Sequence, residues 1–226
     1  MSAVPRVLAR GADPDIEDGI YYPSSDGEPM AETDYHITAI LLLMDALRYF
    51  FRNRPDVFVA SNLFWYWERG NPSARRAPAV MVVPGAGNHP RFSFRRWNEG
   101  GVAPALIIEL TSAKTWREDI GPKYELYKLL GVREYFVFDP MSRYISPAFQ
   151  GYRLKAGRYR PIRPAADRSL ASELGFRLRR QKRLLRVLEG DASEPIPSFE
   201  EIAEQNERLK AELQRLRRRP GEGNDK

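Results

Sequence analysis

An acidic residue, Glu109, lies inside an apolar segment of the sequence, "PALIIELTSAK" at residues 104–114. The segment is typical of a buried β-strand, in which Ala105, Ile107 and Glu109 point to one face of the sheet. Taking an unpaired carboxylate out of water costs several kcal/mol. We therefore expect a cationic partner or a metal ion beside Glu109.

A basic residue, Lys123, lies on the apolar side of the next predicted helix, in register with Leu126, Tyr127 and Leu130. A strand-helix-strand crossover would bring it to face Glu109. In a structural interpretation, the two residues form a buried ion pair that fixes how the helix docks. In a hydrolytic interpretation, Glu109 helps to hold a divalent cation, while Lys123 orients or activates the attacking water. Periodicity does not separate these two interpretations.

The elements that would position both residues predict one mixed α/β domain at residues 31–190, with a central mixed sheet flanked by helices. The pattern predicts two antiparallel strands, at 56–67 and 78–85, and then a parallel strand-helix-strand unit with its helix at about 119–131. Hairpins are predicted at 151–162 and 175–190. A first helix after residue 32 should bury an apolar stripe of Ile37, Ile40, Leu41, Met44, Leu47 and Phe51.

The two ends of the chain have a different character. Residues 1–30 lack hydrophobic periodicity and predict a partly ordered lead-in, and residues 220–226 predict a disordered tail. Residues 198–219 predict a C-terminal coiled-coil helix, and we expect a homodimer that forms through this coiled coil or through the sheet. Its seam consists of Ile202, Asn206, Leu209, Leu213 and Leu216. The alternative is a solvated amphipathic tail that frays.

Composition excludes several classes of protein. The chain has no cysteine and two histidines, which excludes disulfides, thiolate zinc sites and histidine-rich metal sites, so any metal would have oxygen ligands. No apolar run is long enough to span a membrane, and no signal peptide is recognisable, so we expect a cytoplasmic protein. A net charge of +6 suits a polyanionic partner such as DNA.

Three segments, "PALIIELTS", "EDIGPKYELY" and "GVREYFVFDP", resemble the strand-helix-strand core of the Uma-two family of endonucleases, a branch of the PD-(D/E)xK superfamily. The resemblance runs roughly from Glu32 to Leu188 and includes "ETDYH", "YWERGNP", "RRWNEGG", "GYRL" and "SELGFRL". It implies a restriction-endonuclease-like fold and a DNA endonuclease that depends on Mg²⁺ (or Mn²⁺).

The resemblance also implies roles for particular residues. Glu109 matches the metal-binding acid of the family's strand, and Leu110 would supply the backbone carbonyl that follows it. Thr111 occupies the usual lysine position, while Lys123 matches branches in which the lysine has moved to the following helix. Glu32 matches a further acid of the pattern, which would reach the site through water.

The chain departs from the family pattern at Ala79. Where the family reads "APD" before an apolar strand, this chain reads "RRAPAVMVVPG", so Ala79 replaces the first metal-binding aspartate. Asp15, Asp56, Glu68 and Asp119 are the alternative acids. Three accounts remain open: an endonuclease with weakened metal affinity, an inactive nuclease-fold protein that binds nucleic acid or assembles, and a deliberate substitution that traps an inactive form.

A second group of candidates concerns nucleic-acid contacts. The loop "GNHPRFSFRRWNEGG" alternates Arg91, Arg95 and Arg96 with aromatic residues, which suits phosphate contacts beside stacking surfaces. The alternative is a surface loop held in place by its aromatic side chains. The basic segment "FRLRRQKRLLR" favours solvated edge-strand charge. The isolated His36 and His89 favour structural or solvent-facing positions over metal ligation.

Overall fold

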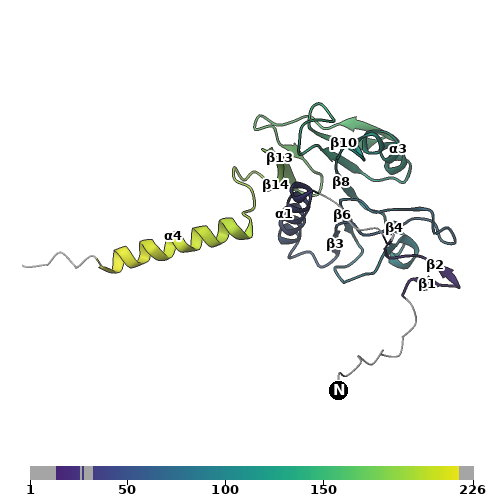
Figure 1. Ribbon diagram of the computed structural model, residues 1–226, viewed down its shortest axis with the longest axis horizontal. Coiled ribbons are helices and arrows are strands. Elements are labelled where there is room, and N and C mark those ends of the chain that lie inside the picture. The colour runs from purple at the N-terminus through teal and green to yellow at the C-terminus, as the bar shows by residue number, and fades with distance from the viewer. Residues whose placement is uncertain (1–13, 26, 28–32, 219–226) are drawn as a thin grey trace, which may run out of the picture.

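The computed structural model describes residues 14–25, 27 and 33–218 (Figure 1). Within these residues a mixed sheet has the strand order β11-β10-β9-β8-β6-β3. Strands β8 and β9 are parallel, and their neighbours pair antiparallel, which confirms the predicted mixed sheet and its strand-helix-strand unit. The strands are β3 (Val57–Ala60), β6 (Val80–Pro84), β8 (Leu106–Leu110), β9 (Glu134–Phe138), β10 (Phe149–Lys155) and β11 (Arg158–Pro161).

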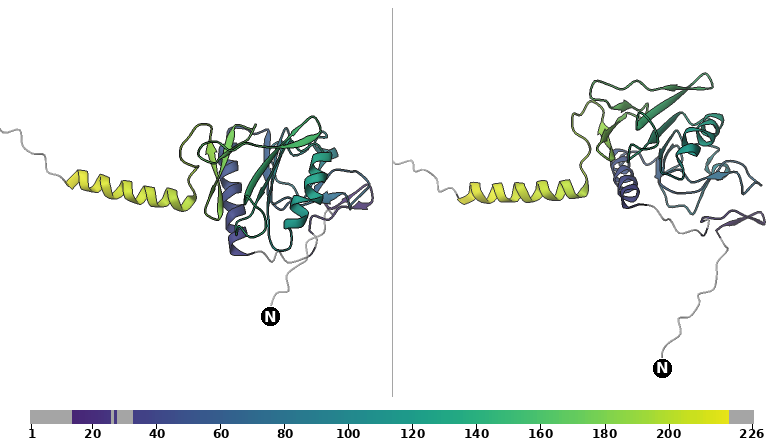
Figure 2. Two further views of the ribbon diagram at one scale, coloured as in Figure 1. Left: turned by 90° about the horizontal axis from the view of Figure 1, so that it is seen from above. Right: turned by 45° about the horizontal axis from the view of Figure 1, so that its top comes forward.

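Helices cover both faces of this sheet (Figure 2). Helix α1 (Asp34–Phe50) lies on one face, beside a small sheet of β12 (Leu170–Ala171), β13 (Phe176–Gln181) and β14 (Leu184–Glu189). Helices α2 (Trp116–Ile120) and α3 (Pro122–Leu129) lie on the other face. Side chains of β8 alternate between the two cores, with Leu106 and Ile108 toward α1 and Ile107 toward α3. Glu109 shares the face of Ile107.

Helix α1 is rotated relative to the predicted stripe. Ile40, Leu47 and Phe51 are buried as expected, but Ile37 is 44% exposed and Leu41 is 51% exposed. His36, Ala39 and Leu43 are buried in their place. The apolar stripe of the sequence is wider than the surface that β14 and β3 cover, so one flank of the stripe remains exposed.

The predicted helix at 119–131 is two helices, because the chain breaks at Gly121. This residue has φ −121° and ψ −98°, and a Cβ here would lie 2.9 Å from the Arg117 carbonyl oxygen. Pro122 then begins α3, a position where its missing N–H costs no helical hydrogen bond. Across the break, Asp119 at the end of α2 and Lys123 in the first turn of α3 lie 2.8 Å apart, and Lys123 also contacts Glu109 of β8.

A further small sheet and a hairpin extend the domain. The sheet joins β5 (Arg75–Arg76), β4 (Trp65–Tyr66) and β7 (Phe94–Arg95), which continues into the short helix η1 (Arg96–Glu99). The hairpin pairs β1 (Ile16–Glu17) with β2 (Ile20–Tyr21). Tyr22 behind it is 1% exposed, and its hydroxyl accepts a bond from the Gly70 N–H at 2.6 Å. This part of the lead-in therefore packs on the domain.

Helix α4 (Phe199–Arg218) projects away from the domain (Figure 1). An ion pair of 2.6 Å between Arg186 of β14 and Glu201 fixes its first turns. The predicted C-terminal helix is confirmed, and its pairing with a second copy stays a prediction. None of the described helices has the length and apolar character needed to cross a membrane.

Candidate active site

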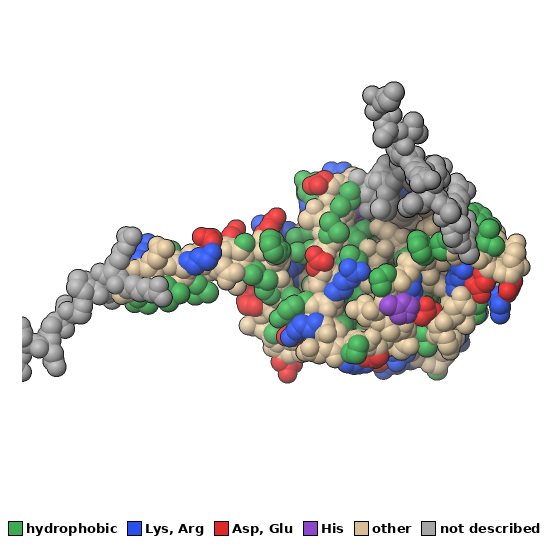
Figure 3. All heavy atoms as spheres, turned by 90° about the horizontal axis from the view of Figure 1, so that it is seen from below, with side chains coloured by type: hydrophobic (Ala, Val, Ile, Leu, Met, Phe, Trp, Pro, Cys, Tyr) green, Lys and Arg blue, Asp and Glu red, His purple; other side chains and the backbone are tan. Residues whose placement is uncertain are grey.

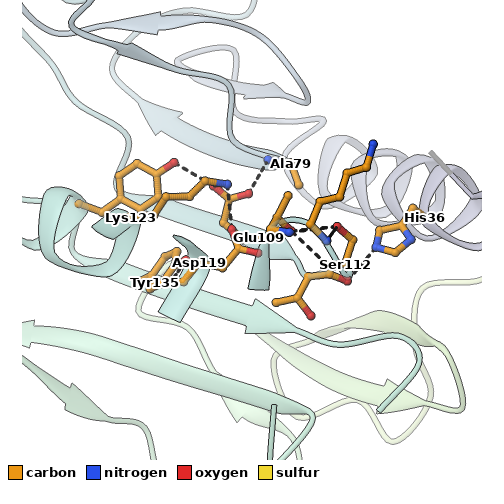
Figure 4. A network of polar contacts seen from close by, with 11 residues as sticks. His36, Ala79, Glu109, Ser112, Asp119, Lys123 and Tyr135 are labelled. Atoms are coloured by element: carbon orange, nitrogen blue, oxygen red, sulfur yellow. Dashed lines mark hydrogen bonds and ion pairs between the residues drawn. The ribbon is translucent and has the colours of Figure 1, made fainter. Parts of the chain in front are cut away.

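Glu109 lies one residue before the end of β8 and is only 3% exposed (Figure 4). Its Oε1 accepts a hydrogen bond from the Tyr127 hydroxyl at 2.8 Å and lies 3.3 Å from the Lys123 ammonium. Its Oε2 accepts the Ala79 backbone N–H at 3.3 Å. The predicted contact between Glu109 and Lys123 is therefore present, and both carboxylate oxygens are held.

A second acid, Asp119 at the end of α2, completes the cluster. It is fully buried, and its Oδ1 accepts a hydrogen bond from the Lys123 ammonium at 2.8 Å. From the sequence, Asp119 was only one of four alternatives for the missing ligand. The available signal was its position four residues before Lys123, which places both side chains on one face of a helical turn.

Burial and charge set the protonation of this cluster. Burial, together with the charge of Glu109, raises the pKa of Asp119 to about 6, although Lys123 opposes the shift. Burial works against the charge on Lys123, but the two carboxylates outweigh it and raise the pKa of Lys123 above its usual range. Burial also raises the pKa of Tyr127, so its hydroxyl remains a hydrogen-bond donor to Glu109. The site therefore combines two buried carboxyl groups, Glu109 and Asp119, with the ammonium group of Lys123.

Ala79, immediately before β6, lies against the cluster. Since its N–H contacts Glu109, an aspartate at this position would extend from a backbone already within hydrogen-bond distance of that carboxylate. Three of the alternative acids lie elsewhere. Asp56 pairs with Arg54, Asp15 accepts bonds from Ser24, and Glu68 accepts one from Asn71. Asp119 is the alternative acid that shares a partner with Glu109.

The donor set of Glu109 and Asp119 fits a hard cation, although the aspartate that the family pattern places at position 79 is absent. Carboxylate oxygens are the ligands that magnesium prefers, and Oδ2 of Asp119 is buried with no hydrogen-bond partner among the described residues. Leu110 directly follows Glu109 in β8. The described part of the chain contains no group of three or more His, Cys, Asp or Glu side chains arranged to hold a metal. Glu32 lies outside the described residues.

His36 has a structural position at the edge of the site. Its Nε2 lies 2.8 Å from the carbonyl oxygen of Thr111, and its Nδ1 lies 2.9 Å from the Thr33 hydroxyl. The first contact ties the start of α1 to Thr111, just after β8, and the second holds the ring against the residue that precedes the helix. The contacts agree with the expectation that His36 is structural rather than a ligand.

The arginines of the 87–101 loop are not gathered at this cluster. Arg91 forms an ion pair of 2.5 Å with Glu99 and lies 4.1 Å from the centre of the Phe58 ring, measured from its guanidinium carbon. Arg95 is buried and pairs with Glu17 at 3.1 Å. Arg96 donates to the Gly101 carbonyl at 2.7 Å. The expected phosphate contacts of Arg91 and Arg95 need correction, because both guanidinium groups bind partners inside the protein. The alternative, a surface loop held in place by its own contacts, describes these two residues better.

Comparisons with known proteins provide a separate line of information. A family model described as "Uma2: Putative restriction endonuclease" matches residues 14–187, which is most of the chain. Among solved structures, the chain is similar to one described as "a putative nuclease belonging to DUF820" from Anabaena variabilis. The identity is 12% and the TM-score 0.48, and the match covers 70% of this chain and 80% of that chain. No curated protein matches the chain.

Proposed function

This chain belongs to the Uma2 family, and from that membership we propose that it is a metal-dependent DNA endonuclease whose active site is the Glu109 cluster. The observation that carries the proposal is the buried contact of Glu109, Lys123 and Asp119 at the carboxyl end of β8. Buried acid–base clusters with strongly shifted pKa values are typical of functional sites. The reaction would be hydrolysis of a phosphodiester bond.

The chain's own residues would divide the work. Glu109, the Leu110 carbonyl and Asp119 would hold Mg²⁺ or Mn²⁺, which when bound polarises the phosphate and lowers the pKa of a water molecule. Tyr127 would keep the Glu109 carboxylate in position through its hydrogen bond. Lys123 would orient the attacking water and offset the negative charge that develops on the phosphate. Because Ala79 supplies no carboxylate, we propose that metal affinity and activity are weakened.

The test compares this chain with Glu109→Gln in cleavage of plasmid and single-stranded DNA, with magnesium and with manganese. We expect the wild-type chain to cleave slowly and Glu109→Gln to lose at least about 100-fold of that rate, since the variant removes a metal-ligand charge while keeping the side-chain shape. Glu68→Gln, an acid outside the cluster, is the matched control. Equal cleavage by Glu109→Gln and wild type would place the active site elsewhere.

A second candidate function is a catalytically inactive nuclease-fold module that binds nucleic acid or assembles. The specific observation in its favour is that Lys123 already contacts both carboxylates, so the cluster is satisfied as a structural ion network. DNA binding without cleavage in either metal, unchanged by Glu109→Gln, would select this function.

We also propose that the chain forms a homodimer through helix α4. Along α4, the apolar side chains of the heptad seam remain exposed: Ile202 by 42%, Leu209 by 57%, Leu213 by 55% and Leu216 by 57%. Figure 3 shows hydrophobic side chains along one side of this helix. Pairing with a second α4 would bury them around Asn206, a residue type that specifies register in two-stranded coiled coils.

Disrupting this seam should produce monomers. We expect Leu209→Gln with Leu213→Gln to shift the mass measured by sedimentation equilibrium from dimer to monomer, because most of the apolar area of the seam is lost. Lys210→Gln, an exposed residue beside the seam, is the control. An unchanged dimer in the double variant would move the interface to another surface.

A further inference from the structure

A groove separate from the Glu109 cluster lies between the β10–β11 hairpin and the β13–β14 hairpin. Its volume is about 840 Å³. Two of its lining side chains, Phe149 and Leu170, belong to the core that faces α1. Glu109 points to the opposite core, so the groove and the cluster are on different sides of the sheet. The groove's walls are contributed by residues 147–152, 161, 162, 164, 168, 170, 180 and 182.

The lining combines apolar surface with positive charge. Apolar and planar side chains, including Phe149, Ile162 and three prolines, form most of the walls. Arg168, Arg180 and Lys182 line the same groove, and no acidic residue does so among the described residues. This composition complements a ligand that has both a flat apolar part and a negative charge.

Two of the three cations are free to bind a ligand. Arg180 is anchored, since it donates to the Ser142 hydroxyl at 2.6 Å and to the Lys182 carbonyl at 2.9 Å. Within the described residues, the side chains of Arg168 and Lys182 have no hydrogen bond or ion pair. Elsewhere on β13 the arginines are engaged: Arg177, for example, pairs with Asp167 at 2.9 Å.

The backbone at these two cations makes their side chains unexpected. Arg168 has φ +62° and Lys182 has φ +56°, in the left-handed region that turns usually assign to Gly, Asn or Asp. A long cationic side chain gives no advantage to such a turn. The turn geometry therefore does not account for the cation at either position beside the groove.

We propose that this groove binds an unpaired segment of single-stranded nucleic acid, with a base against the apolar wall and its phosphates at Arg168, Arg180 and Lys182. Single-strand sites combine basic grooves with flat side chains on which bases stack. The groove and the proposed active site lie on opposite faces of the sheet near the same ends of strands, since Leu110 pairs with Phe138 and Phe138 pairs with Phe149. Two strand spacings, roughly 10 Å, separate the ends of β8 and β10. Binding in the groove does not require cleavage at the proposed active site.

The test measures binding of short oligothymidylate and oligouridylate by fluorescence anisotropy, in EDTA so that metal-dependent cleavage cannot occur. The variant is Arg168→Gly with Lys182→Gly, which removes both free cations and places glycine where φ is positive, so the fold should be retained. At about 0.1 M salt, each lost single-strand phosphate contact should weaken binding about 5-fold. We expect the double variant to bind about 25-fold more weakly. The slope of log affinity against log salt concentration should be less steep by about 1.4. Lys155→Ala, an exposed cation at the far end of β10, is the matched control.

The outcomes are distinguishable. DNA and RNA bound alike, with weaker binding of abasic or fully duplex probes, would support recognition of an unpaired base. Preference for one of the two sugars would identify the natural strand. The proposal is overturned if the double variant binds as tightly as wild type, or if an acidic peptide competes as well as the oligonucleotide. If Glu109→Gln loses cleavage but binds the oligonucleotide unchanged, the groove proposal stands. If Arg168→Gly with Lys182→Gly loses binding alone, the assignment of Glu109 is unaffected.

Discussion

Ala79→Asp is expected to raise magnesium-dependent DNA cleavage by at least about 10- to 100-fold over the wild-type chain. The Ala79 N–H already lies 3.3 Å from Oε2 of Glu109, so the new carboxylate would start beside the one that is present. A further carboxylate beside Glu109 and Asp119 adds a hard oxygen donor and negative charge, and both favour a divalent cation. The same variant should gain thermal stabilisation on adding magnesium or manganese, which reports metal binding without depending on catalysis.

Ala79→Asn is the control for this result. It has nearly the same shape as the aspartate, but it adds no charge, so it should gain neither cleavage nor metal-induced stabilisation. Position 79 is only 8% exposed and packs against the core, so circular dichroism should first establish that both variants fold. If Ala79→Asp folds and binds metal no better than Ala79→Asn, the account of a nuclease that lost one ligand fails. If it binds metal but still does not cleave, the chain lacks more than this carboxylate.

The sequence predicted the core of the cluster because its signal was local. Glu109 interrupts an apolar strand, Lys123 interrupts the apolar side of a helix, and a parallel crossover brings such residues together. Asp119 remained one of four alternatives because the pattern of apolar residues does not reveal which acid is buried, although its four-residue spacing to Lys123 was visible.

The loop arginines were misjudged for a different reason. Arg95 pairs with Glu17, 78 residues earlier in the chain, in a hairpin that the composition of the lead-in gave no reason to expect. Likewise, the exposed flank of α1 depends on how much surface β14 covers, and that strand lies more than a hundred residues further along. Local periodicity predicts which charged residues lie on an apolar face. Partners that are distant in the sequence decide which of those charges are neutralised.

Lys123→Met is expected to destabilise the fold by about 3–5 kcal/mol near pH 8, the usual cost of removing one partner from a buried ion pair. The ammonium contacts Glu109 at 3.3 Å and Asp119 at 2.8 Å, and both carboxylates are buried. Methionine keeps most of the volume of lysine, so packing should change little and the loss should be electrostatic. The measurement is the free energy of unfolding from urea titrations. Lys128→Met, one helical turn and a half further along at a partly exposed position, is the matched control.

The pH dependence of the stability lost in Lys123→Met distinguishes an electrostatic contribution of Lys123 from a packing contribution. In the wild-type chain the pKa of Asp119 is raised to about 6 from 3.8, so between these values the folded state keeps a proton that the unfolded chain releases. Stability due to this group is therefore fully present below pH about 4 and is lost as the pH rises through 6. Lys123 opposes the rise in the pKa of Asp119, so in Lys123→Met that pKa should rise further. Lys123→Met should therefore approach wild-type stability at pH about 4 and fall behind steadily above it. Asp119→Asn, which keeps an oxygen but removes a charge, should restore roughly 1–3 kcal/mol to Lys123→Met at pH 8. A loss that is equal at both pH values, and that Asp119→Asn does not relieve, would mean that Lys123 contributes through packing, and the cluster would then lose its electrostatic basis as an active site.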